Sequence, residues 1–204
     1  GFTGMKFRCG AESSAEAESN RARVVRDAVG DDIKIMVDIN EGWDIPRTMA
    51  VARYFEAHDV FWLEDPIDHN DLEGYRQLVN ALDIPITQGE YLYGAQPIYE
   101  VVKQGAADIV MIDAHHAGGI DPWMKAAAVC ELGNKPVATH LSPEIAVHLG
   151  AATSNLLTVE YMTWSFGLFN ESMDLDENGD LKLPQGPGLG VSLNDDTVKA
   201  GLVS

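Results

Sequence analysis

Short apolar runs alternate with stretches of helical character along most of the chain. The runs lie at residues 33–38, 60–64, 84–90, 107–113, 135–140 and 156–160, and residues 5–8 form a further strand-like segment with alternating cations. Strands that alternate with helices indicate a parallel sheet. A strand, a helix and their two loops take roughly 25–30 residues in an α/β barrel, which is close to the spacing of these runs. The pattern therefore predicts an α/β fold with about seven parallel strands of a TIM-like barrel.

Capping residues and prolines mark where the intervening helices begin. Ser13 or Ser14 opens the first predicted helix, and Asn70 or Asp71 opens the third. The six predicted helices cover approximately residues 14–28, 46–57, 70–82, 97–105, 122–133 and 142–152. Several of them end next to a glycine, which is typical of a helix C-terminus.

The pattern changes after residue 160. Residues 161–204 are rich in Gly, Pro, Asp and Asn and show no clear helix before Asp195. Residues 174–180 resemble the start of a calcium loop, but the twelfth position is Gln185 where the loop needs a bidentate Glu. A hairpin that turns at Asn178 and Gly179 is the better interpretation. We therefore divide the chain into a barrel domain, residues 1–162, and a C-terminal extension with a hairpin, residues 163–204.

Composition restricts the class of protein. The 14 Lys and Arg residues against 32 Asp and Glu residues give a net charge of −18, which argues against nucleic acid as a partner. No apolar stretch approaches the 18 or more residues of a membrane span, and we expect no membrane partner. The chain shows no signal peptide and has only two cysteines, so a cytoplasmic location is expected.

Three acidic residues close successive apolar runs. Asp38, Glu64 and Glu90 follow one another at intervals of 26 residues. Parallel barrel strands bring their C-terminal ends to one face, where such barrels carry their chemistry, so the three carboxylates are expected to converge. Convergent carboxylates repel each other unless a cation lies between them, and oxygen ligands favour Mg²⁺ before Mn²⁺ or Ca²⁺. The alternative is three unrelated surface acids in an acid-rich protein.

The later runs continue this series of polar ends. Asp113, His140 and Glu160 close the last three runs, and Lys6 and Arg8 alternate in the first strand-like segment, which places both on one face. A lone histidine is more often a satisfied core residue than a catalytic one. For His140, Asp113 and the acids that close the other runs make a catalytic role the better interpretation.

Taken together, these residues resemble the enolase superfamily, in its mandelate racemase subgroup, from Gly4 to about Gly190. The resemblance implies a metal site, a catalytic dyad and substrate contacts. Under it, the Mg²⁺ ligands are Asp38, Glu64 and Glu90, with Mn²⁺ as a possible substitute; the Asp–His dyad is Asp113 and His140; the electrophilic acid is Glu160; the first lysine of a Lys-x-Lys motif is Lys6; and the substrate contacts are Arg8 and Asn40.

The chain departs from the family pattern at two points. Arg8 replaces the second lysine, and a guanidinium does not serve readily as a proton acceptor. The family also has an N-terminal α+β capping domain and a first barrel strand, which are missing from this sequence. Because open sheet edges seek partners, we expect that the chain does not stand alone as a closed monomer. A preceding segment of the same protein, another copy in a homo-oligomer, or the residues from Met162 onward would cover the gap.

The resemblance implies Mg²⁺-dependent removal of the α-proton of a carboxylate substrate through a metal-stabilised enediolate. Racemisation needs a competent proton-transfer group on each face of the substrate, whereas dehydration needs one base and one acid, and His140 can play both roles in turn. We therefore expect an acid-sugar dehydratase that converts a sugar acid to a 2-keto-3-deoxy acid. The alternatives are a racemase or epimerase that uses Lys6 as the second base, and a catalytically silent, incomplete barrel.

Overall fold

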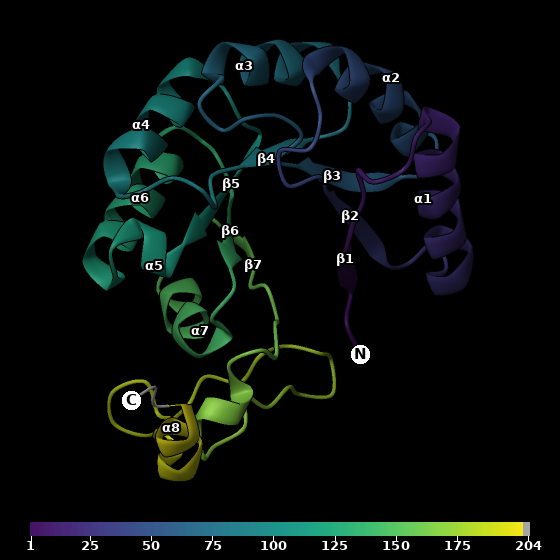
Figure 1. The fold of residues 1–204 in the computed structure, drawn as a ribbon. Coiled ribbons are helices and arrows are strands. Elements are labelled where there is room, and N and C mark those ends of the chain that lie inside the picture. The colour runs from purple at the N-terminus through teal and green to yellow at the C-terminus, as the bar shows by residue number, and fades with distance from the viewer. Residues whose placement is uncertain (202–204) are drawn as a thin grey trace.

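Parallel strand pairing in chain order organises the fold. The computed structural model describes residues 1–201, and within them seven parallel strands form one sheet in the order β1 to β7 (Figure 1). The strands are β1 (Gly4–Arg8), β2 (Lys34–Asp38), β3 (Val60–Glu64), β4 (Ile86–Gln88), β5 (Ile109–Asp113), β6 (Val137–His140) and β7 (Leu156–Thr158). The sheet curls about an interior, as expected for an incomplete TIM-like barrel. The predicted fold class is therefore confirmed for these residues.

The connecting helices lie on the outer, convex side of the curled sheet (Figure 1). They are α1 (Ala15–Val29), α2 (Ile45–Glu56), α3 (Leu72–Ala81), α4 (Ala95–Gln104), α5 (Ala114–Ala117), α6 (Ile120–Leu132) and α7 (Pro143–Ala151); a 3-10 turn η1 (Phe166–Leu168) and α8 (Asp195–Gly201) follow in the C-terminal segment. The predicted caps are confirmed at Ser14, which accepts from Ala17 N, and at Asp71, which accepts from Gly74 N. These side chains satisfy backbone donors that a helix leaves free at its start.

Three elements differ from the predicted pattern. β4 and β7 are shorter than expected, so that Glu90 and Glu160 lie two residues beyond their strands. The strand β4 ends where Gly89 adopts a φ of 131°, a conformation that breaks the extended backbone. The short helix α5, which was not among the six predicted helices, contains His115 and His116 and forms because the Asp113 carboxylate accepts from both of their backbone N–H groups.

Two apolar clusters lie on the two faces of the sheet. The larger one fills the space between the sheet and the helices and includes Phe55, Tyr75 and Trp123. The smaller one lies inside the curl and consists of Trp62, Ile109, Met111 and Ala138, with Met36 and Phe61 packed against it. This inner cluster forms the floor beneath the C-terminal ends of the strands.

Within residues 1–201, β1 and β7 stand at the two ends of the strand order and are not paired with each other. A cavity of about 680 Å³ opens between them, lined by the two strands and by parts of the C-terminal segment that follows Glu160. Phe2 and Tyr161 meet across this opening with ring centroids 5.5 Å apart. Which partner covers the two edges stays a prediction, as does the division into a barrel and an extension.

The C-terminal segment is held by short contacts. Leu175 and Leu181 form an antiparallel bridge, and the Asp176 carboxylate accepts from the N–H groups of Asn178 and Asp180 in the turn between them.

No helix in the described part of the chain combines the length and the apolar character of a membrane span.

Gly89 offers a test of the fold next to the strand ends. A Cβ atom there would collide with the carbonyl oxygen of Met111, and the positive φ adds strain. We expect Gly89→Ala to lower the free energy of unfolding by roughly 2–6 kcal/mol, because strain and overpacking each cost about 1–3 kcal/mol. Gly105→Ala is the matched control, since Gly105 also has a positive φ of 65° but an added Cβ meets no atom within 4 Å. Urea denaturation measures both; equal losses in the two variants would contradict the predicted collision.

Candidate active site

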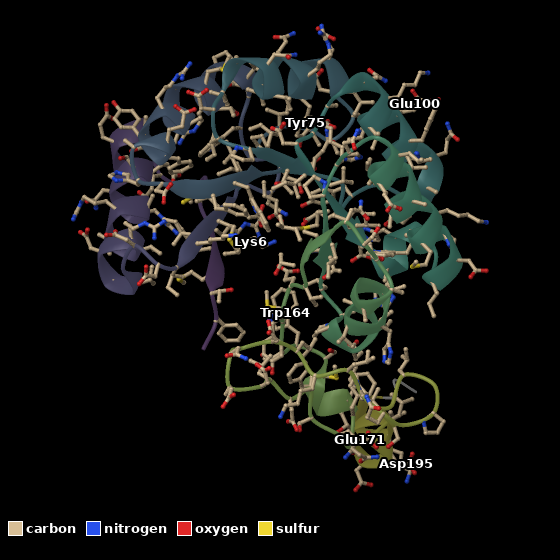
Figure 2. All side chains as sticks on the ribbon, turned by 180° about the vertical axis from the view of Figure 1, so that it is seen from behind. Lys6, Tyr75, Glu100, Trp164, Glu171 and Asp195 are labelled. Carbon is tan, nitrogen blue, oxygen red and sulfur yellow. The ribbon has the colours of Figure 1, made fainter. Side chains whose placement is uncertain are left out.

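Polar side chains gather at the C-terminal ends of the parallel strands. Strand register places Asp38 beside Glu64 and Asp113 beside His140. Figure 2 shows the side chain of Lys6 pointing from β1 into the space that the sheet encloses. The structure therefore brings together the residues that the sequence placed at successive strand ends.

Three buried carboxylates form the centre of the site. Glu64, Asp65 and Glu90 each place an oxygen within 4.8 Å of the others, and their exposed fractions are 0%, 0% and 5%. Asp38, on the neighbouring strand, is outside this 4.8 Å group. Burial and the nearby charge of Glu90 nevertheless raise the pKa of Asp38, against the lowering effect of Lys6. The convergence of Glu64 and Glu90 agrees with the prediction, while Asp38 approaches less closely.

Asp65, the residue after Glu64, also places its carboxylate in the cluster. Its Oδ1 accepts from the hydroxyl of Tyr75 at 3.3 Å, and the buried Oδ2 has no hydrogen-bond partner among the described residues. Tyr75 comes from α3 and lies on the helical side of the sheet (Figure 2). Burial and the charges of Glu90 and Glu64 raise the pKa of Asp65 well above its usual range.

Lys6 supplies a positive charge at the centre of the site. Its Nζ lies 2.5 Å from Glu64 Oε1 and 2.9 Å from Glu160 Oε1. Burial alone would lower the pKa of Lys6, but the two carboxylates raise it above the ordinary value. Burial likewise raises the pKa of Glu64, although the Lys6 ammonium opposes this shift. Lys6 is thus held as an ammonium, and its charge only partly offsets the surrounding carboxylates.

His140 and Asp113 form a hydrogen-bonded pair. His140 Nδ1 lies 2.8 Å from Asp113 Oδ2, and Nε2 lies 3.3 Å from Glu90 Oε2. Asp113 Oδ1 accepts from the backbone N–H groups of His115 and His116, each at 2.7 Å, so its carboxylate is fixed. Burial would lower the pKa of His140, but the hydrogen bond to Asp113 and the charge of Glu90 raise it. The pair holds the ring with Nε2 directed at the carboxylate cluster.

The substrate contacts expected from the sequence lie at the edge of the cluster. Arg8 donates to Asn40 Oδ1, and Asn40 Nδ2 donates to the hydroxyl of Tyr91. The backbone N–H of Asn40 donates to Asp38 Oδ1 at 2.8 Å. Arg8 and Asn40 are therefore coupled to each other and, through the backbone, to a carboxylate of the site.

Glu160 is anchored although it lies beyond β7. Its Oε2 accepts from Leu141 N at 2.7 Å, and its own N–H donates to Thr139 Oγ1 at 3.1 Å. These contacts tie the last acid of the series to the neighbouring strand β6, so Glu160 reaches Lys6 from a fixed position.

Strained backbone follows the strand ends. The residues with positive φ within three positions after Asp38, Glu64 or His140 are Asn40, Glu41, Asp65, Leu141 and Ser142. Such conformations cost free energy in residues other than glycine and cluster at functional sites. The strain lets the chain turn sharply away while the preceding side chain keeps its direction into the site.

Sequence reasoning missed three contributors. Trp62 Nε1 donates to Glu64 Oε2 at 2.9 Å, Tyr91 accepts from Asn40, and His116 Nδ1 lies 2.5 Å from the backbone oxygen of Glu90. The two-residue period of a strand could have pointed to Trp62, since it shares a face with Glu64. Tyr91 lies in a turn after β4 and His116 in the short helix α5, and the sequence does not specify the path of either segment.

The donor set fits a hard divalent cation. Among the described residues, the carboxylates of the site outnumber the ammonium of Lys6, and the buried Asp65 Oδ2 has no hydrogen-bond partner. Burial raises the pKa values of Asp38, Glu64 and Asp65. Oxygen-only ligands are those that Mg²⁺, Mn²⁺ and Ca²⁺ prefer. Asp38, Glu64 and Glu90, with Asp65 behind them, could hold such an ion.

Asp65→Asn tests the excess of negative charge. Because the pKa of Asp65 in the folded protein is above its unfolded value of about 4, the folded state holds a proton that the unfolded chain releases, and this destabilises the fold increasingly as pH rises above about 4. In EDTA, Asp65→Asn should therefore stabilise the protein at pH 7. The gain should grow by up to about 1.4 kcal/mol per pH unit until the raised pKa is reached.

Thermal unfolding from pH 5 to pH 8 measures this gain, with the exposed Asp32→Asn as the control. A gain that does not change with pH, or the same trend in the control, would contradict the interpretation.

Comparisons with known proteins agree with this geometry. A family model described as "Enolase C-terminal domain-like" matches residues 1–197. An L-talarate/galactarate dehydratase of Salmonella typhimurium is 34% identical over 195 residues, which are 96% of this chain and 48% of that protein. An arabinonate dehydratase of Saccharolobus solfataricus is 32% identical, with 96% and 54% covered. The chain thus spans about half the length of the curated relatives it matches.

A solved structure has the same fold. The L-talarate dehydratase of Polaromonas sp. JS666, crystallised with Mg and L-glucarate, superposes with a TM-score of 0.92 at 36% identity. The match covers 98% of this chain and 55% of that one. The barrel described above therefore corresponds to one part of a larger enzyme in that organism.

Proposed function

Because the chain belongs to the enolase superfamily, we propose that it forms the catalytic barrel of a Mg²⁺-dependent acid-sugar dehydratase. The reaction removes the α-proton of a sugar acid and the hydroxyl group of the adjacent carbon, and the resulting enol becomes a 2-keto-3-deoxy acid. The observation that carries the proposal is the position of His140, which Asp113 holds with Nε2 facing the carboxylate cluster.

Asp38, Glu64 and Glu90 are the proposed Mg²⁺ ligands, and Mn²⁺ could replace the ion. When bound, Mg²⁺ supplies positive charge that attracts the substrate carboxylate and stabilises the negative charge that develops on it as the α-proton leaves. The crystallised relative from Polaromonas, described with Mg and L-glucarate, supports this choice of ion and substrate class.

His140 is the proposed base. With its Nδ1 proton donated to Asp113, the neutral imidazole presents a lone pair on Nε2 that can accept the α-proton. The same nitrogen then carries the proton that the leaving hydroxyl needs. His140 thereby acts first as a base and then as an acid, and the proton that it takes from the α-carbon leaves with the hydroxyl group as water.

Lys6, Glu160, Arg8 and Asn40 are the proposed substrate-positioning groups. Lys6 can donate to the substrate carboxylate, and its ion pairs with Glu64 and Glu160 keep it protonated, which disfavours it as a base. Arg8 and Asn40 lie at the edge of the cluster, where they can donate to hydroxyl groups along the sugar chain. This distribution of charge favours dehydration over racemisation.

A panel of acid sugars tests the proposal. Incubated with Mg²⁺, the protein should form a 2-keto acid from at least one aldarate or aldonate, since the relatives named above act on talarate, galactarate or arabinonate. Semicarbazone absorbance detects the product. EDTA should abolish the activity, and added Mg²⁺ should restore it. A protein that binds Mg²⁺ but turns over no member of the panel would contradict the dehydratase assignment.

His140→Asn should separate proton abstraction from metal binding. We expect exchange of the substrate α-hydrogen with D₂O to fall by at least about 100-fold, the lower range for a general base, while the Mg²⁺ affinity changes little. His148→Asn is the control, because His148 bonds to the backbone oxygen of Leu189 outside the site. If α-hydrogen exchange survives in His140→Asn at a near-normal rate, another group is the base.

Arg8→Lys distinguishes the dehydratase from the racemase or epimerase that would use Lys6. A lysine at position 8 adds a group able to exchange a proton on the second face, so some epimerised substrate should appear by proton NMR in D₂O. Epimerisation by the unaltered protein, without dehydration, would favour the alternative in which Lys6 is the second base.

The cytoplasmic location and the covering of the β1 and β7 edges, by a preceding segment or another copy, remain predictions.

A further inference from the structure

We propose that Trp62 is a positioning residue for the cation site: its indole N–H holds Glu64 Oε2, which leaves Oε1 as the oxygen that would ligate a cation. This inference rests on the proposed function only in that the site binds Mg²⁺. The sequence interpretation gave Trp62 no role, and its contact with Glu64 appears only in the folded structure.

The geometry of β3 makes this contact possible. Trp62 and Glu64 are two residues apart on one strand, so both side chains point into the interior of the curled sheet. The distance from Trp62 Nε1 to Glu64 Oε2 is 2.9 Å, and the exposed fractions are 2% and 0%. An indole has one donor and no acceptor, and a buried donor without a partner costs free energy. The indole and the carboxylate therefore satisfy each other away from water.

The surroundings of Trp62 fix the indole in place. Ile109, Met111 and Ala138 pack with it in the inner apolar cluster, and only 2% of Trp62 is exposed although the residue also borders the cavity between β1 and β7. A carboxylate that accepts a hydrogen bond from a fixed ring has a fixed orientation as well. The inner cluster thereby sets the direction of Glu64, although none of its members carries a charge.

The second oxygen of Glu64 is used differently. Glu64 Oε1 lies 2.5 Å from Lys6 Nζ, so it already faces a positive charge. Lys6 also contacts Glu160 Oε1 at 2.9 Å and can keep that partner if a metal cation takes its place at Oε1. Trp62 is neutral and bonds to the other oxygen, so it need not move. One oxygen is thus anchored and the other is available for exchange between cations.

Trp62→Phe tests the role of the N–H group. Outer hydrogen-bond partners of metal ligands typically contribute 10–100-fold to metal affinity, so we expect the Kd for Mg²⁺ to rise at least about 10-fold by isothermal titration calorimetry. Trp123→Phe is the matched control, because Trp123 is equally buried and its indole N–H donates to the backbone oxygen of Ile112, on the helical side of the sheet. Its Kd for Mg²⁺ should stay within twofold of the parent, with circular dichroism confirming that both variants are folded.

Indole NMR of the unaltered protein provides a second measurement that does not depend on the folding of Trp62→Phe. The four tryptophans each give one Nε1–H signal, and the Trp62 signal can be assigned by elimination with Trp43→Phe, Trp123→Phe and Trp164→Phe. Addition of Mg²⁺ should shift the Trp62 signal in step with the calorimetric saturation and leave the Trp123 signal in place.

The outcomes separate the inference from the proposed function. If the parent binds Mg²⁺ but its Trp62 signal does not move, or a folded Trp62→Phe binds Mg²⁺ within twofold of the parent, the inference is wrong and the metal site stands. If the parent binds no Mg²⁺ at millimolar concentration, the proposed function is wrong and the inference falls with it.

Discussion

Repulsion among carboxylates held at the ends of adjacent parallel strands is the constraint on which this structure depends. Glu64, Asp65 and Glu90 are buried within a few ångströms of each other, and a single ammonium, that of Lys6, lies between Glu64 and Glu160. Such an arrangement is costly in a low-dielectric interior unless further positive charge is present. The cost is a reason to regard the cluster as a cation site, since packing alone would be served better by apolar residues.

The remainder of the site holds these charges in fixed directions. Asp113 orients His140 and is itself held by two backbone N–H groups, while Trp62 holds one oxygen of Glu64. The strained residues after the strands turn the chain away without disturbing the side chains before them. Fixed direction matters because a preorganised group stabilises developing charge without having to reorient during the reaction.

The curled sheet brings the residues of the site together. Each strand contributes one or two polar side chains, and the register between neighbours decides which of them meet: Asp38 with Glu64, and Asp113 with His140. Beneath them the inner apolar cluster supports the strands, and Trp62 and Met111 of this cluster also line the cavity that opens between β1 and β7. The opening between β1 and β7 leads to Lys6 and Glu160, so the polar groups nearest to it depend most on whatever lies against those strands.

The sequence by itself determined the alternation of strands and helices and the polar residue at nearly every strand end. These features are local: apolar runs, capping residues such as Ser14 and Asp71, and a spacing set by one strand and one helix. They were sufficient to predict the parallel sheet and the convergence of Glu64 and Glu90, whereas the pairing of Asp113 with His140 was expected from the resemblance to the enolase superfamily. The tertiary structure alone decided that Asp65 enters the cluster, that Lys6 pairs with Glu64, and that Trp62 bonds to the other oxygen of that carboxylate. Those contacts depend on the curvature of the sheet, on register and on backbone strain, which arise from packing between segments far apart in the chain and leave no local signature in the residues concerned.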